Sequence, residues 1–264
     1  MSWARFAATL QSAGRFRSSA ASHEGAVRTK NEDSYVNRPD LGLWAVADGA
    51  GGHQAGDLAS RILTDALSAV PRDLGAAQIL AEVRLRVQSA HERLLEEAGR
   101  RGPEAMLVST LVVLLARGGH FACLWAGDSR AYLLRDRTLS QVTHDHSLVQ
   151  ELVDAGAIRS EEAFGHPNAN IITRAVGIRD AILVLDKVTD YLRPGDRFLL
   201  CSDGLSKTLA EGELAVLLAA DDAAAGDFLA AALERGADDN VTVVTVEVLA
   251  NSPSEAEITV RRTI

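Results

Sequence analysis

Residues 109–136 read STLVVLLARGGHFACLWAGDSRAYLLRD, and this stretch decides the fold class. It holds three short apolar runs, 109–118, 120–128 and 130–136, which are broken by Gly-Gly and Gly-Asp pairs. Short apolar runs broken by glycine-containing turns are typical of antiparallel strands joined as a meander. We therefore expect the middle of the chain to form antiparallel sheet.

Two long amphipathic helices are predicted upstream of these strands. Apolar residues recur every three or four positions in 56–70 and in 76–99, and Pro71 and Gly102 mark the ends of these segments. The other expected elements are strands at 33–39, 42–49, 182–189, 197–202 and 241–248, helices at 147–156, 211–219 and 223–235, and a loop at 157–170. Strands cluster with strands and helices with helices, so we expect an α+β fold of two stacked antiparallel sheets with helices outside, in one domain.

Composition narrows the classes of function. The chain has 264 residues, 47% of them hydrophobic, and this length can bury a sizeable core. Its 27 basic and 36 acidic residues give a net charge of −9, which argues against nucleic acid as a partner. Two cysteines cannot build a disulfide framework, and no apolar run reaches the ~20 residues of a membrane-spanning helix. We therefore expect a cytoplasmic protein without a membrane span.

Carboxylates recur where the predicted strands end. Asp48, Asp128 and Asp203 each follow an apolar strand, and Asp239 closely precedes the last one. One such residue is usually a turn former or a helix cap, but neighbouring strands would bring four of them to one edge of the sandwich. A carboxylate at the end of a buried strand is costly unless it is paired, hydrogen-bonded or bound to a cation. Clustered carboxylates suit hard divalent ions such as Mg²⁺ or Mn²⁺, and two ions sharing one carboxylate form a hydrolytic site.

The run DGAGGH at 48–53 is too rich in glycine for a strand or a helix, so we expect a turn that leads into the helix at 56. Gly49 has no side chain, so its carbonyl oxygen can approach an ion closely. A Gly-rich turn from strand to helix also serves nucleotides, but this run lacks the lysine of a phosphate-binding P-loop.

Eight short motifs together resemble one known family. They are RTKNED at 28–33, VADGAGGHQAGDLAS at 46–60, STL at 109–111, AGDSRAYL at 126–133, THDHS at 143–147, TRAVG at 173–177, LCSDGL at 200–205 and DDNVT at 238–242. In this order they are similar to the metal-dependent serine/threonine protein phosphatases of the PPM family (type 2C), in their bacterial form. The resemblance covers roughly residues 16–248.

The resemblance implies a four-layer αββα sandwich, in which two antiparallel β-sheets are flanked by helix pairs. It also implies that Asp48 bridges two Mn²⁺ or Mg²⁺ ions and that the Gly49 carbonyl binds one of them. Asp203 and Asp239 complete the other ion's ligands. Asp128 matches a position that holds a third ion in bacterial members, with Asp203 shared between sites.

Three further residues receive roles from the resemblance. Glu32 and Asp33 match carboxylates that hold metal-bound waters. Arg28 matches the arginine that grips the substrate phosphate, a task that suits the planar donor fork of a guanidinium.

The implied reaction is hydrolysis of phosphoserine and phosphothreonine proteins by direct attack of a metal-activated water, without a phosphoenzyme. Such an enzyme opposes a bacterial serine/threonine kinase. The family's candidate acid is a histidine directly after the Asp-Gly pair, and this chain has Ala50 there, as bacterial members commonly lack that histidine. Either a metal-bound water or His53 then supplies the proton, or no dedicated acid exists.

The resemblance also divides the chain into parts. The phosphatase domain is expected at 16–249, with an unassigned N-terminal segment at 1–15 and a polar C-terminal tail at 250–264. Residues 157–170 match a flap beside the active site that helps to choose substrates. Its candidate contacts are Arg159, His166, Asn168 and Asn170.

Two other functions remain open beside the phosphatase. A catalytically silent binding or regulatory protein would keep the fold, but it would be expected to lack one of Asp48, Asp203 and Asp239, and all three are present. A different two-metal hydrolase is the third candidate, and the acidic charge balance disfavours a nuclease. We expect a monomer in each case.

Overall fold

The computed structural model describes residues 9–51, 55–163, 165–179 and 182–250. Sheet A has the strand order β1-β2-β12-β11-β8-β9, and sheet B has the order β10-β7-β6-β4-β3 with β5 paired to β4. Within the described residues the strands of both sheets pair antiparallel. The strands of sheet A are β1 Thr9–Ala13, β2 Phe16–His23, β8 Arg130–Arg135, β9 Thr138–Gln141, β11 Arg197–Cys201 and β12 Val241–Val248. Those of sheet B are β3 Asp33–Arg38, β4 Leu43–Ala50, β5 Val108–Ser109, β6 Leu111–Arg117, β7 His120–Ala126 and β10 Asp186–Tyr191.

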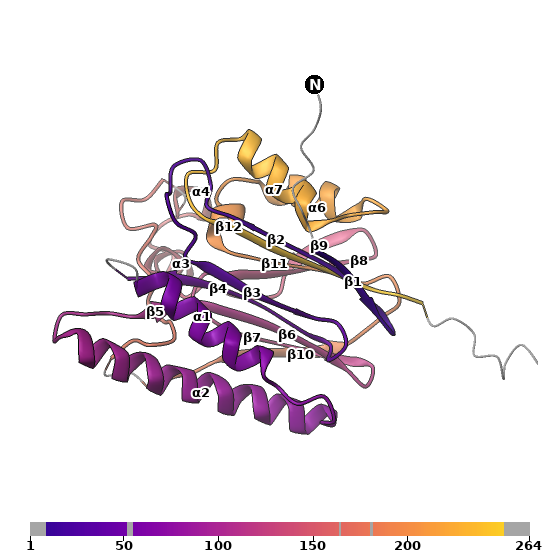
Figure 1. The fold of residues 1–264 in the computed structure, drawn as a ribbon. Coiled ribbons are helices and arrows are strands. Elements are labelled where there is room, and N and C mark those ends of the chain that lie inside the picture. Colours follow the sequence, from indigo (N-terminus) through magenta and orange to yellow (C-terminus); the bar gives the residue numbers. More distant parts are fainter. Residues whose placement is uncertain (1–8, 52–54, 164, 180–181, 251–264) are drawn as a thin grey trace, which may run out of the picture.

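Helices cover the outer faces of the two stacked sheets (Figure 1). The long helices α1 (Ala55–Ser68) and α2 (Ala76–Arg101) lie on sheet B, and α6 (Glu211–Ala219) and α7 (Ala225–Glu234) lie on sheet A. Three short helices lie between strands, namely α3 Leu148–Asp154, α4 Ser160–Ala163 and α5 Asp203–Ser206. The expected four-layer sandwich with helix pairs outside is therefore confirmed.

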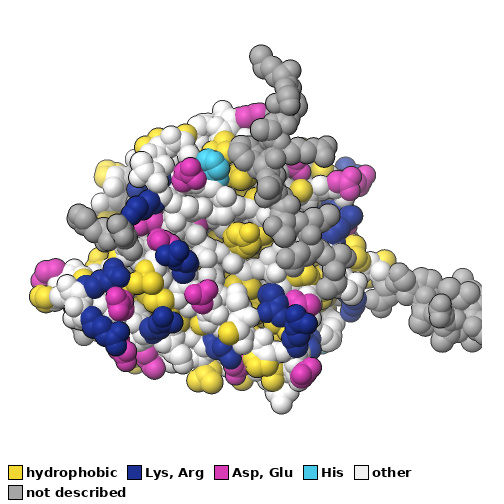
Figure 2. Space-filling model, viewed as in Figure 1, with side chains coloured by type: hydrophobic (Ala, Val, Ile, Leu, Met, Phe, Trp, Pro, Cys, Tyr) yellow, Lys and Arg dark blue, Asp and Glu magenta, His cyan; other side chains and the backbone are white. Residues whose placement is uncertain are grey.

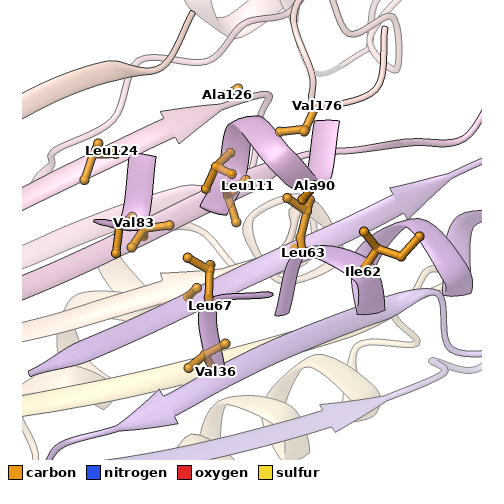
Figure 3. Close-up of a cluster of buried hydrophobic side chains, with 14 of the residues drawn as sticks. Val36, Ile62, Leu63, Leu67, Val83, Ala90, Leu111, Leu124, Ala126 and Val176 are labelled. Carbon is orange, nitrogen blue, oxygen red and sulfur yellow. The ribbon is translucent and has the colours of Figure 1, made fainter. Parts of the chain in front are cut away.

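Three hydrophobic clusters fill the three interfaces between these layers. Figure 3 shows the cluster between sheet B and the α1–α2 pair, to which Leu63 and Leu67 of α1 and Val83 of α2 contribute. A second cluster between the sheets contains Trp44 and Phe198, and a third lies between sheet A and α5–α7. The strand at 111–117 alternates between the first two clusters, which explains why its sequence is apolar at successive positions.

The strand β2 is the main element that apolar patterning did not predict. Its sequence FRSSAASH is small and polar, yet it pairs with β12 over eight residues in the middle of sheet A. Buried hydroxyl groups are accommodated by hydrogen bonds, because Ser18 donates to Asn37 at 2.7 Å and Ser19 accepts from the Ala225 N–H at 3.1 Å. Satisfied buried polar groups do not carry the cost of unpaired ones, so a polar strand fits this position. The neighbouring strand β1 falls within the segment 1–15 that sequence patterning left unassigned.

Several element boundaries were predicted wrongly. β10 begins at Asp186 and ends at Tyr191, not at 182–189, because most of this edge strand is exposed and polar. The expected loop 157–170 contains the short helix α4. β4 continues through Asp48 and Gly49 to Ala50 because β5 pairs with its end, so the Gly-rich turn starts later than expected. The tail at 251–264 lies outside the described residues.

The helices can be described by their apolar length and by their surface charge. In the part of the chain that the structure describes, no helix is both long and apolar enough for a membrane span. Over α1 and α2, basic side chains are interspersed with acidic ones on the visible face (Figure 2). Three ion pairs illustrate this mixing: Arg61 with Asp57, Arg86 with Glu82, and Arg101 with Glu97.

Trp44 provides a test of the packing between the sheets. Its ring is fully buried and meets Phe16 edge to face at 5.2 Å, while its Nε1 has no hydrogen-bond partner among the described residues. We predict that Trp44→Ala lowers the free energy of unfolding by about 3–5 kcal/mol because it leaves a large cavity. Trp44→Phe is predicted to cost less than half as much, since it keeps a ring and removes the unpaired N–H. Urea unfolding measures both, and equal losses would contradict this account of the interface.

Candidate metal centre

The topology brings five carboxylates to one end of the sandwich. β4 and β7 both pair antiparallel with β6 in sheet B and therefore run parallel to each other, so Asp48 and Asp128 lie at the same end of that sheet. Asp33 lies directly opposite Asp48 in the β3–β4 register. In sheet A, Asp203 follows β11 and Asp239 precedes its antiparallel neighbour β12, so these two also share an end.

The charges of these five side chains act on one another. Burial and the charges of Asp33, Asp203, Asp128 and Asp239 raise the pKa of Asp48 well above its ordinary value. Burial raises the pKa of Asp33 to about 7. The charges of Asp203 and Asp239 act in the same direction, whereas hydrogen bonds from Ser202 and Thr242 act to lower this pKa. Burial and the charge of Asp203 raise the pKa of Asp128 to about 7, against the attraction of Lys207. Like charges that face one another across a strand pair destabilise a sheet unless a cation lies between them.

Hydroxyl groups beneath the carboxylates hold the backbone of the site. Thr110 accepts the Asp48 N–H at 3.1 Å and shares a 2.7 Å hydrogen bond with Ser129, and Ser109 donates to the Asp48 carbonyl at 3.0 Å. Ser202 donates to Asp33 Oδ2 at 2.7 Å and accepts the Thr242 N–H. Ser109, Thr110, Ser129 and Ser202 are all buried, so these bonds are shielded from water.

Asn240 fixes the segment that carries Arg28 and Glu32. Its side-chain N–H groups donate to the carbonyls of Glu24 and Lys30, and its Oδ1 accepts the Glu32 N–H at 2.7 Å. Asn240 is buried and follows Asp239, so it ties the loop before β3 to the start of β12. Glu32 and Arg28 are thereby placed beside the carboxylate cluster.

A close backbone approach explains why residue 49 is glycine. A Cβ at this position would lie 2.0 Å from the Gly56 carbonyl oxygen and 2.9 Å from that of Glu32. The Gly49 N–H donates to the same Glu32 carbonyl at 3.2 Å. Gly49 therefore allows the end of β4, the first turn of α1 and the start of β3 to meet at the site.

Two cationic side chains already contact the carboxylates. Lys207 Nζ bonds Asp203 Oδ2, and Arg28 bonds Asp239 Oδ2 at 2.9 Å. Within the described residues no three His, Cys, Asp or Glu side chains stand together as a ready ion-binding group. The side chains of Asp203 and Asp239 are thus oriented by Lys207 and Arg28, and not toward a shared ion position.

Unsatisfied oxygens show that the cluster nonetheless fits divalent cations. Asp33 Oδ1 and Asp128 Oδ1 are buried and have no hydrogen-bond partner in the described part of the chain. A buried carboxylate oxygen without a donor or cation is costly, and carboxylate oxygens are the ligands that Mg²⁺ and Mn²⁺ prefer. The donor set of the site is therefore that of a hard divalent metal.

The residues expected in the flap differ in their contacts to the carboxylate cluster. Asn170 reaches the cluster through Lys207: its Oδ1 accepts a hydrogen bond from Lys207 Nζ at 2.7 Å, and Lys207 also bonds Asp203. Arg159 pairs with Glu162 on α4, and His166 accepts the Asn168 N–H in a local turn, so these contacts stay within the segment itself. The candidate acid His53 lies outside the described residues.

Three residues of the site received no role from the sequence patterns: Ser202, Asn240 and Lys207. Ser202 and Asn240 stand directly before Asp203 and after Asp239, and their side chains differ little from ordinary turn formers in sequence. Lys207 follows Asp203 by four residues, the spacing at which side chains meet on a helix, and this is the signal that marks it.

Comparison with known proteins identifies the family. A model of the family described as protein phosphatase 2C matches residues 21–242. The serine/threonine protein phosphatase PstP of Mycobacterium tuberculosis is 37% identical over 235 residues, which cover 88% of this chain and 45% of PstP. The chain thus spans about half the length of that relative. The serine/threonine phosphatase stp of Listeria welshimeri is 36% identical over 233 residues, covering 84% of this chain and 92% of stp.

Solved structures agree with this match. The structure of PppA, described as a key regulatory component of T6SS in Pseudomonas aeruginosa, superposes with a TM-score of 0.82 at 43% identity, covering 89% of this chain and 99% of PppA. The catalytic domain of PstP in complex with two manganese ions superposes with a TM-score of 0.80 at 35% identity, with 89% and 99% covered. This chain therefore belongs to the protein phosphatase 2C family, the metal-dependent PPM serine/threonine phosphatases of bacteria.

Proposed function

We propose that this chain is an active serine/threonine protein phosphatase that uses Mn²⁺ or Mg²⁺. The observation that carries the proposal is the group of five mutually repelling carboxylates, drawn from both sheets, at one end of the sandwich. Asp48, Asp203 and Asp239, with the Gly49 carbonyl, would hold two ions, and Asp128 is the candidate for a third. Bound divalent ions of this kind lower the pKa of water and polarise phosphoryl oxygens, which is the chemistry of two-metal hydrolysis.

Arg28 is the residue proposed to bind the substrate phosphate. Its side chain is 56% exposed and contacts the expected ligand Asp239, so it lies at the rim of the site and within reach of solvent. A guanidinium offers two parallel N–H donors to a phosphate, and phosphate oxygens attract it as a carboxylate does. We expect Arg28 to leave Asp239 for the phosphate when substrate binds. Glu32 and Asp33 are proposed to orient water near the same carboxylates.

The leaving oxygen of serine or threonine needs a proton. Ala50, at the end of β4, carries no group that donates one, so this proton comes from elsewhere. We keep His53 and bound water as the two candidate sources. Phosphoserine and phosphothreonine proteins are the proposed substrates, and a bacterial serine/threonine kinase is the proposed functional opponent.

The proposed compartment is the cytoplasm. Cys123 and Cys201 are free and buried, and burial raises the pKa of both thiols to about 12. Neutral buried thiols behave as small apolar side chains, which fits a reducing environment. The monomeric state stays a prediction.

Replacement of Asp239 tests the proposed activity. We predict Mn²⁺-dependent phosphate release from a phosphothreonine peptide, abolished by chelator and reduced more than about 100-fold by Asp239→Asn, since even outer partners of metal ligands cost 10–100-fold. Asp238→Asn removes the same charge one residue earlier, on an exposed side chain, and is expected to retain near-normal activity.

The opposite result has a definite meaning. No phosphate release by folded wild-type protein loaded with Mn²⁺, on several phosphopeptides and on an aryl phosphate, would contradict the proposal. That result would favour the catalytically silent binding protein.

The segment around α4 tests substrate choice. We predict that exchanging residues 159–169 for a relative's sequence, with Asn170 kept, changes kcat/KM ratios among phosphopeptides more than kcat/KM for an aryl phosphate. The reason is that the contacts of Arg159, His166 and Asn168 are local, with Glu162 and within the turn at 166–168, whereas a small aryl phosphate needs only the carboxylate cluster. Equal effects on both substrate kinds would show that the segment does not select substrates.

A further inference from the structure

Lys207 lies within the carboxylate cluster and is held there at two points. Its N–H donates to the Asp203 carbonyl at 2.8 Å, because α5 places residue 207 one turn after residue 203. Its ammonium group bonds Asp203 Oδ2 and also donates to Asn170 Oδ1 at 2.7 Å. A backbone tie and two side-chain acceptors thus fix the position of one positive charge.

This charge faces more than one carboxylate. Asp128 is 6% exposed, its Oδ1 has no partner among the described residues, and its charge interacts with both Asp203 and Lys207. Asp203 and Asp128 therefore share one corner of the site, and Lys207 is the cationic side chain that the structure brings into it. The side chains of Lys207 and Asp203 are 35% and 15% exposed.

An ordinary ion pair four residues apart on a helix does not account for this arrangement. Such pairs on a helix surface are exposed to solvent and contribute little to stability. Lys207 instead points toward carboxylates from two sheets, where positive charge relieves repulsion. The ammonium and a divalent ion would compete for Asp203 Oδ2, and both would act on the charge of Asp128.

We propose that Lys207 is a positioning residue that supplies the positive charge of the Asp128–Asp203 corner, in place of a third metal ion. The inference rests on the proposed function, because it concerns the occupancy of the same metal centre. It revises the proposed third ion at Asp128: at Mn²⁺ concentrations that saturate the first two sites, this chain is expected to hold two ions rather than three. The repulsion between a fixed ammonium and a divalent ion excludes the third.

The number of bound ions tests the proposal directly. Calorimetric titration of metal-free protein with Mn²⁺, checked by equilibrium dialysis, counts the ions in wild type, Lys207→Met and Lys207→Arg. Lys207→Met removes the charge but keeps an unbranched side chain of similar length. We expect two ions in wild type and Lys207→Arg, and a third ion in Lys207→Met that binds at least about tenfold tighter than any third ion in wild type.

A double variant locates the gained ion. Adding Asp128→Asn to Lys207→Met is expected to abolish the third ion and leave two. A third ion of equal affinity in wild type and Lys207→Met would overturn the proposal, as would a gained ion that survives Asp128→Asn. Fewer than two ions in wild type would instead contradict the proposed function itself, and the inference would fall with it.

Discussion

Repulsion among carboxylates at one end of the β-sandwich is the interaction on which the rest of the structure depends. Asp33 and Asp48 face each other across neighbouring strands, and Asp128, Asp203 and Asp239 add their charges to the same region. This arrangement raises the free energy of the folded chain, because burial and repulsion disfavour the charged forms. A fold that keeps it must hold these groups in place by other interactions and reserve the position for cations.

The scaffold supplies those other interactions at two levels. Three apolar clusters bind the layers together, and strands such as β6 contribute side chains to clusters on both of their faces. Near the site, buried hydroxyls hold the backbone of Asp48 and the side chain of Asp33, and Asn240 holds the segment before β3. The cations Arg28 and Lys207 offset part of the repulsion at Asp239 and Asp203.

The pattern of apolar residues predicted those helices and strands that are held in place by buried apolar side chains. The helices α1 and α2 and the strands β6, β7 and β8 each bury apolar side chains, so their periods are visible in the sequence. The predicted meander of these three strands is wrong at its last strand, because β6 and β7 pair in sheet B whereas β8 lies in sheet A. β2 was missed because hydrogen bonds, rather than apolar side chains, satisfy its buried positions Ser18 and Ser19. Local spacing says nothing about such distant partners.

The same distinction applies to the site. The carboxylates were predicted from their repeated position at strand ends, which topology converts into proximity. Ser202 and Asn240 received no role from the sequence, because each acts through a hydrogen bond to a residue far away in the chain. Ser202 bonds Asp33, and Asn240 bonds Glu32. Lys207 was missed because its spacing of four residues from Asp203 is common in sequences, and its contacts to Asp203 and Asn170 are what place the pair in the site.

The central claim is that the carboxylate cluster destabilises the fold unless cations occupy it. The raised pKa values of Asp33 and Asp128, about 7 in the folded chain, mean that the metal-free protein loses stability as pH rises from ~4 through 7, where the unfolded chain has already released these protons.

The most direct test is urea unfolding of wild type and Asp48→Asn at pH 8, in chelator and in Mn²⁺. In chelator, Asp48→Asn is expected to raise the free energy of unfolding by about 1–3 kcal/mol, because it removes one of the repelling charges. Mn²⁺ is expected to stabilise wild type strongly and the variant little. A variant that is less stable than wild type in chelator, with an undiminished response to Mn²⁺, would contradict the account.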